Sequence, residues 1–457
     1  MLLLAMCLGV FIAQLDSQVV NLALRHIGND LDSGVSALQW VMDSYNLAYA
    51  TFLLTDGTLG DLYGRVRLFV VGIGLLIAGS LVCALAPDTA TLIAGRIVTG
   101  LGAALAVATS LSILAVAYPD PGRRAHAIGI WASCNGIAIG PTLGGALVDS
   151  VGWRSIFALV IAPCVLAMLL AYWRVPETHD ARSRTLDPLG QTFAIIALAS
   201  LAFISIEGPH LGWTSPVIIT LLIAFIISLI AFVMVERNRN DAMVPLDLFR
   251  ISQFNAALAC ATAMTFGMYA MMFLTPLYLQ MQGGASAFQV GLLLLPMSVT
   301  FIIVSQISGW LDRRFGARNL MTAGLACMGI GLLLLTQIST TPNMPLIESA
   351  FVIIGIGLGF NTAPVNAVAV ASVPARRSGT ASGLINTARM VGATLGIAIL
   401  GSIYAIRAGG SSPQDAIAGL RFAFLGGGCV ELTGALIAVL FIPAHAMGRT
   451  ANENARP

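Results

Sequence analysis

Long apolar stretches separated by short polar connections run through the whole chain. A helix needs about 20 apolar residues to cross the ~30 Å hydrocarbon core of a bilayer. The pattern predicts an all-α, polytopic membrane protein with fourteen transmembrane helices. The predicted spans are residues 2–24, 38–58, 67–86, 90–116, 125–148, 153–173, 188–206, 215–235, 253–279, 286–308, 319–338, 346–372, 378–405 and 419–443.

The distribution of arginine supports this number of spans and predicts their orientation. An even number of spans places both termini on one side of the membrane. With that side inside, 17 of the 23 basic residues fall on inner loops, inner span ends or the tail, and 4 fall outside. Positive charge accumulates on the cytoplasmic side of membrane proteins. The protein is therefore expected in the cell membrane with both termini in the cytoplasm. One span more or fewer would reverse the sides of all later loops and remove the excess of basic residues on the inner side.

Two longer inner connections divide the chain. They lie near residues 174–187 and 236–250 and bracket spans 7 and 8. We therefore expect a 6 + 2 + 6 arrangement: an N-terminal six-helix bundle (1–174), a linker with two inserted transmembrane helices (175–250), and a C-terminal six-helix bundle with a short cytoplasmic tail (251–457). The segment Gly57–Arg67 has an imperfect echo in Gly309–Arg318. Duplicated halves around a central cavity are typical of secondary transporters.

Composition narrows the class of protein. Hydrophobic residues make up 57% of the chain and charged residues 10%, whereas soluble domains carry about 25% charge. The net charge of +2 gives no reason to expect a nucleic-acid partner. The seven cysteines are scattered and suggest no metal site or disulfide framework. The chain begins with an apolar run without a basic flank, which we interpret as the first span rather than a signal peptide.

Two charged residues are expected deep in the membrane. Asp16 lies about two-thirds of the way through span 1, and Arg96 lies within span 4. Ionisable groups at such depth are costly and usually functional. Asp16 is expected to hold a proton or favour a cationic substrate, the alternative being a buried acid that only bonds its neighbours. Arg96 needs a partner, for which Asp16 is a candidate, and the alternative for Arg96 is a fixed structural ion pair.

Other polar positions are weaker candidates. Asp43 and Glu431 are possible substrate or proton acids, although Asp43 can equally be an interfacial acid near the outer surface. Arg389 is a third intramembrane charge, with Glu431 as a possible partner. Possible cavity-lining residues are Asn361, Asn366 and Tyr45.

Seven motifs carry a more specific signal because they occur together and in order. They are Leu15–Leu24, Trp40–Leu47, Gly57–Arg67, Gly95–Ala104, Gly136–Gly145, Trp153–Phe157 and the Ser378–Gly396 segment. In these motifs the chain resembles the fourteen-span drug:proton antiporters of the major facilitator superfamily, over nearly its whole length. It departs from the usual pattern at Gln18, Arg25 and Thr99.

The resemblance implies roles for particular residues. It implies that Asp16 and Arg96 take part in proton coupling. It also implies that the loop motif acts as a conformational latch, the alternative being an ordinary basic inner loop. The loop residues are Gly57, Asp61, Gly64, Arg65 and Arg67.

A glycine-rich segment of span 5 suggests the direction of transport. Glycines four residues apart form a flat face for close helix packing, and proline permits a kink. The resemblance implies that this antiporter motif marks exporters. Its residues are Gly136, Gly140, Pro141, Gly144 and Gly145.

The sequence therefore predicts a proton-coupled exporter of small hydrophobic or cationic compounds that works by alternating access and functions as a monomer. No phosphate-binding GxxxxGK[ST] loop or HExxH motif occurs. We accordingly expect no enzyme activity and no cofactor, with the proton gradient as the energy source. One alternative is a dedicated exporter of a single natural product or lipid, or an importer, on the same fold. A membrane enzyme or a sensor is the alternative of another class.

Overall fold

The described part of the chain is built from helices joined by short connections. The computed structural model describes residues 1–118, 120, 123, 126–128, 130–131, 134, 139–175, 177, 187–239, 243–281, 284–374, 377–408 and 412–443. Gly136 lies outside these residues, and so does the side chain of Asp61. The elements in the described part are α1 (Leu2–Asp30), α2 (Val35–Tyr63), α3 (Arg65–Ala84), α4 (Thr89–Ala117), α6 (Ile139–Val151), α7 (Arg154–Arg174), α8 (Pro188–Leu211), α9 (Pro216–Arg237), the short 3-10 helix η2 (Leu246–Arg250), α10 (Ser252–Met281), α11 (Ala287–Phe315), α12 (Ala317–Leu335), α13 (Met344–Ala371), α14 (Ser378–Ala408) and α15 (Pro413–Phe441).

Twelve of the described helices are long and apolar enough to cross a membrane. The set comprises every α-helix above except α2 and the 13-residue described part of α6. The twelve spans make the chain an integral membrane protein, and the expected all-α class is confirmed.

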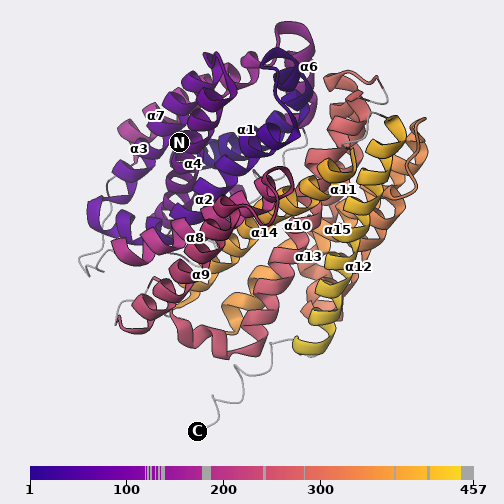
Figure 1. The fold of residues 1–457 in the computed structure, drawn as a ribbon. Coiled ribbons are helices and arrows are strands. Elements are labelled where there is room, and N and C mark those ends of the chain that lie inside the picture. Colours follow the sequence, from indigo (N-terminus) through magenta and orange to yellow (C-terminus); the bar gives the residue numbers. More distant parts are fainter. Residues whose placement is uncertain are drawn as a thin grey trace.

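The helices fall into two groups (Figure 1). Helices α1 to α7 pack together, chiefly through α3 with α4 and α2 with α4, and α10 to α15 pack together through α12 with α13 and α10 with α14. The two groups meet along two seams, α2 against α14 and α6 against α11. The inserted helix α8 packs on α9 and also contacts both α2 and α14, so it covers one of the seams.

Burial separates central helices from peripheral ones. In the most apolar part of each helix, 72% of α10 and 67% of α1 and of α4 are buried, but only 11% of α9. A helix that is hydrophobic all round and exposed in a membrane protein faces lipid. Helix α9 is therefore peripheral, whereas α1, α4 and α10 lie inside the bundle, where a functional site must be sought.

The segment Gly57–Arg67 differs from the loop that the sequence suggested. Helix α2 continues through Gly57 to Tyr63, and α3 begins at Arg65, so the connection is the single residue Gly64 with φ +96°. Residues that carry a Cβ atom rarely adopt this backbone conformation, so glycine is required at this one turn. In the second half, Gly316 with φ +83° joins α11 to α12 in the same manner. The two turns strengthen the internal echo.

Candidate functional site

Glycines in α4 let its neighbours approach closely enough to enclose a site. A Cβ added at Gly100 would lie 2.5 Å from the Tyr45 carbonyl oxygen of α2. One added at Gly95 would lie 2.6 Å from Cys83 Sγ of α3. Because only glycine fits such crossings, α4 is held tightly between α2 and α3. Arg96, between these two glycines, is completely buried.

Arg96 and Asp16 form an ion pair in the interior of the first half. Arg96 Nη1 donates to Asp16 Oδ2 at 2.6 Å. The two side chains are 0% and 1% exposed. The structure thus brings together the two charges that the sequence singled out and makes Asp16 the partner of Arg96.

Further contacts fix the orientation of the guanidinium group. Arg96 Nε donates to the Val41 carbonyl oxygen at 3.1 Å. The Tyr45 ring lies 4.4 Å from Arg96 Cζ, within the range of a cation–π contact. The Tyr45 hydroxyl donates to the Ala13 carbonyl oxygen at 3.0 Å, so Tyr45 spans from α2 to α1 beside the pair. Tyr45 is therefore a wall of the charged site.

The arrangement can couple protonation to movement. Asp16 Oδ1 and Arg96 Nη2 have no hydrogen-bond partner among the described residues. A proton added to Asp16 would remove the negative charge that is paired with Arg96, and an unpaired buried charge is strongly unfavourable. Protonation must therefore be accompanied by a new partner for Arg96, by its displacement, or by the entry of solvent.

Asp43 and Glu431 are buried, and no described residue forms an ion pair with either of them. Both are 0% exposed, and none of their carboxylate oxygens has a hydrogen-bond partner in the described part of the chain. Glu431 on α15 packs against α10, where a Cβ on Gly267 would lie 2.7 Å from Glu431 Oε1. Asp43 lies on α2, two residues from Val41. Isolated acids at membrane depth are candidates for binding protons or cations.

Arg389 bonds to a backbone carbonyl oxygen of α13. Arg389 Nη2 donates to the Thr362 carbonyl oxygen at 3.1 Å, and the side chain is only partly buried. No ion pair joins it to Glu431 in the described residues. Its own carbonyl oxygen accepts from Thr265 Oγ1 at 2.6 Å, which ties α14 to α10.

The two asparagines of α13 bond mainly within their own helix. Asn361 Nδ2 donates to the Gly357 carbonyl oxygen, and Asn366 Nδ2 donates to the Thr362 carbonyl oxygen, both at 3.1 Å. Asn361 is completely buried against Gly324 of α12. Its position is between two helices of the second half.

The described end of the loop motif is tied to the linker. The backbone N–H groups of Val66 and Arg67 donate to the carboxylate of Glu177, at 2.9 and 3.0 Å. Arg67 Nε lies 4.0 Å from Glu177 Oε2. Glu177 therefore caps the start of α3, and it also packs beside Gly64. This contact could not be predicted from the sequence, because more than a hundred residues separate the partners.

The glycine-rich motif places α6 between the two halves. Gly140 lies against Leu15, and Gly144 lies against Val19, both on α1. Gly145 lies against the backbone of Ala287 on α11, and Gly291 of α11 lies against the Pro141 carbonyl group. The expected close packing is thus present on two faces of α6.

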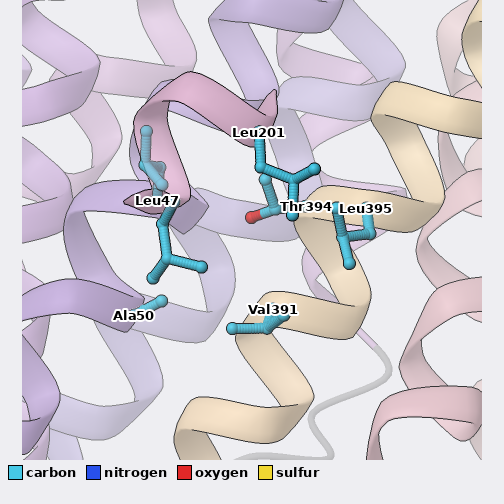
Figure 2. A pocket seen from close by; sticks show the side chains of 7 residues that line it. Leu47, Ala50, Leu201, Val391, Thr394 and Leu395 are labelled. Atoms are coloured by element: carbon cyan, nitrogen blue, oxygen red, sulfur yellow. The ribbon is translucent and has the colours of Figure 1, made fainter. Parts of the chain in front are cut away.

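A small apolar pocket marks the seam between α2 and α14 where α8 covers it (Figure 2). Its walls are Leu47 and Ala50 of α2, Leu198 and Leu201 of α8, and Val391, Thr394 and Leu395 of α14. Thr394 is the one residue of this lining with a polar side chain. Neither Asp16 nor Arg96 lines this pocket, so the ion pair is a separate site.

Sequence reasoning missed the residues that join the halves. Gln39 Nε2 donates to the carbonyl oxygens of Ile397 and Ala398, and Asp149 accepts from two backbone N–H groups of α11. Both lie within a few residues of a helix end, where polar residues are common. Their partners are backbone groups, which leave no signature in a sequence.

Comparison of the sequence with known proteins assigns the chain to a family. The sequence profile of the Major Facilitator Superfamily matches residues 6–397. The multidrug resistance protein Stp of Mycobacterium tuberculosis (strain CDC 1551 / Oshkosh) is 40% identical over 410 residues, which cover 88% of this chain and 75% of that protein. The methylenomycin A resistance protein of Bacillus subtilis (strain 168) is 34% identical, over 99% of this chain and 96% of that protein.

A solved structure has the same fold at low sequence identity. A bacterial homologue of the human lysosomal transporter Spinster, in an inward-facing and occupied conformation, superimposes with a TM-score of 0.70. It is 17% identical, and the match covers 97% of this chain and 96% of that chain. The chain belongs to the Major Facilitator Superfamily and is a membrane transporter rather than an enzyme.

Proposed function

We propose that this protein is a proton-coupled exporter of small hydrophobic or cationic drugs that works by alternating access. Two of its relatives are named for resistance to drugs, one to several and one to methylenomycin A. The second name favours one further candidate, a dedicated exporter of a single natural product. The observation that carries the proposal of proton coupling is the completely buried Asp16–Arg96 pair.

The proposed topology has fourteen spans arranged 6 + 2 + 6, with both termini in the cytoplasm and the protein in the cell membrane as a monomer. Helix α2 supports this count, since it is 29 residues long and packs against both halves. Helix α6 supports it through its contacts with α1 and α11. The inserted helices α8 and α9 form their own hairpin beside the α2–α14 seam.

In the proposed cycle, a proton entering from outside neutralises Asp16, and Arg96 is released from it. The freed guanidinium remains beside Tyr45 and the Val41 carbonyl oxygen while α1 and α4 shift relative to each other. When Asp16 loses the proton to the cytoplasm, the pair forms again. A cationic drug that binds near the ionised Asp16 would compete with the proton, which is the logic of exchange.

Other residues have supporting roles in this proposal. Asp43 and Glu431 are further sites for a proton or a cationic group, and Arg389 is a fixed charge within the second half. Tyr45, Asn361 and Asn366 shape the interior. The motif of Gly57, Asp61, Gly64, Arg65 and Arg67 acts as a conformational latch on the inner side, and Gly140, Gly144 and Gly145 allow α6 to slide between α1 and α11.

Transport into inverted membrane vesicles tests the proposal. With the vesicle interior acidified, a cationic dye should accumulate in vesicles that contain the protein, and a protonophore should abolish the accumulation. Arg96→Gln vesicles with equal amounts of protein provide the matched control. Accumulation that is unaffected by the protonophore would contradict proton coupling, whereas uptake of one natural product and no dye would favour the dedicated exporter.

A further inference from the structure

Several hydrogen bonds that join the two halves lie at one end of the molecule. This end, which we call the gate end, is where α1 and α6 finish and where α2 and α11 begin. Arg25 donates to the Gln280 carbonyl oxygen, and Gln280 Nε2 donates to the Leu22 carbonyl oxygen at 3.0 Å. Gln39 donates to α14 at 2.9 and 3.2 Å. The gate end is therefore closed.

Asp149 makes a different kind of bond across this end. It lies in the last turn of α6, and its carboxylate faces the first turn of α11 in the other half. Asp149 Oδ1 accepts from the Ala287 N–H at 3.0 Å, and Asp149 Oδ2 accepts from the Phe288 N–H at 2.8 Å. One carboxylate thus binds the first two amides of a helix that belongs to the opposite bundle.

The rest of that helix end is capped within its own half. Ser286 Oγ accepts from the Gln289 N–H at 3.3 Å, and the Gln289 side chain accepts from the Ser286 N–H at 2.9 Å. This capping box satisfies the third helical amide but leaves the first two amides without a partner in α11. Asp149 supplies that partner, so the set of caps is complete only when the halves touch.

The charge of Asp149 also suits this position. The N-terminus of a helix carries a partial positive charge, and a carboxylate placed there is favoured. Hydrogen bonds to an ionised acceptor are stronger than those between neutral groups. When the halves separate, Asp149 loses two donors and α11 loses the anion at its N-terminus. The bond therefore favours the closed gate end and vanishes in the open one.

The helix packing around the bond explains how the groups come so close. Gly145, one turn before Asp149, lies against the backbone of Ala287 and Phe288. A side chain at this position would collide with that backbone and hold Asp149 away from it.

We propose that Asp149 is a gating residue whose carboxylate caps the N-terminus of α11 across the two halves and holds the gate end closed. This inference rests on the proposed function, because opening and closing of the gate end have a role only in transport by alternating access. In that cycle the gate end must open outward. The cap itself is independent of cargo and of proton coupling.

Hydrogen–deuterium exchange of the full-length protein in detergent micelles tests the cap directly. In Asp149→Ala, exchange at the amides of Ala287 and Phe288 should rise about fivefold, the effect of losing one helix cap. Exchange in the segment 397–401 of α14, at the other seam, should rise with it, because the whole gate end opens more often. Asp149→Asn, which keeps one acceptor oxygen, should fall between Asp149→Ala and the unmodified protein.

Ser286→Ala is the matched control. It removes a cap from the same helix end but from within one half, so exchange should rise at Gln289 and stay unchanged in segment 397–401. If Asp149→Ala behaves like Ser286→Ala, with a local effect only, the cap is a structural detail and the proposed gating role is wrong. No change at Ala287 or Phe288 in Asp149→Ala would also overturn the proposal.

Transport separates this inference from the proposed function. If the unmodified protein moves no drug while the exchange pattern appears, the proposed function fails and the cap stands. If the protein exports drug and Asp149→Ala leaves exchange in segment 397–401 unaltered, the gating role fails and the proposed function stands.

Discussion

At the scale of the residue, the charges inside the membrane differ in what surrounds them. Asp16 and Arg96 bond to each other, and a carbonyl oxygen and an aromatic ring also contact the arginine. Among the described residues, Arg389 donates to one carbonyl oxygen, and neither Asp43 nor Glu431 has a hydrogen-bond partner. A paired site that must break to accept a proton is suited to coupling. An isolated acid can bind a proton or a cation without breaking an ion pair.

Removing one member of the pair should destabilise the protein and stop transport. Asp16→Asn leaves Arg96 as an unpaired buried charge, which costs about 3–5 kcal/mol. We expect a clear fall in the detergent unfolding temperature and loss of proton-driven dye export.

The double variant Asp16→Asn/Arg96→Gln separates stability from coupling. It removes both charges, so most of the lost stability should return while dye export remains absent. Thermal unfolding and vesicle transport on the same preparations measure the two effects. If export recovered together with stability, the pair would have a structural role only and no role in proton coupling.

At the scale of the element, the sequence predicted where helices lie better than where they end. The span predicted at residues 2–24 is a helix over Leu2–Asp30, and the span at 188–206 is Pro188–Leu211. Apolar patterning reports the part of a helix that meets lipid, whereas the backbone stays helical into the polar region. The starts were often marked by caps, as at Asp88, whose pKa is lowered by its hydrogen bonds to Thr91.

The one-residue turn at Gly64 should not tolerate a side chain. Gly64→Ala places a Cβ at φ +96° and against the Glu177 carboxylate, with an expected destabilisation of about 1–3 kcal/mol. Gly74→Ala is the control, because a Cβ there meets nothing within 4 Å and its helix is regular. Thermal unfolding compares the two, and equal stability would refute the account of this turn.

The α6–α11 seam should depend on a glycine in the same way. In Gly145→Ala, the new Cβ would meet the Ala287 carbonyl group, at 2.7 Å from its carbon. We expect the seam to loosen and dye export to slow several-fold, while Gly74→Ala transports normally. Cross-linking or exchange across the seam would detect the loosening, and an undisturbed seam with full export would contradict the close-packing argument.

At the scale of the whole molecule, the repeated halves were visible in the sequence but their contacts were not. The echo of Gly57–Arg67 in Gly309–Arg318 predicted two related bundles, and Gly64 and Gly316 make the same turn in each. The pairing of Asp16 with Arg96 was one option among several, because eighty residues separate them. The closed gate end was not foreseen, since it joins side chains such as Gln39 and Asp149 to distant backbone groups.

Asp16 is proposed to exchange a proton for substrate, and the release of protons when substrate binds tests this claim most directly. Purified protein in a weakly buffered detergent solution is mixed with a transported cationic dye, and the pH is recorded. The unmodified protein should release protons in proportion to dye bound, and Asp16→Asn should release far fewer at equal amounts of folded protein. Equal proton release by both proteins, or dye binding without any release from the unmodified protein, would contradict the claim.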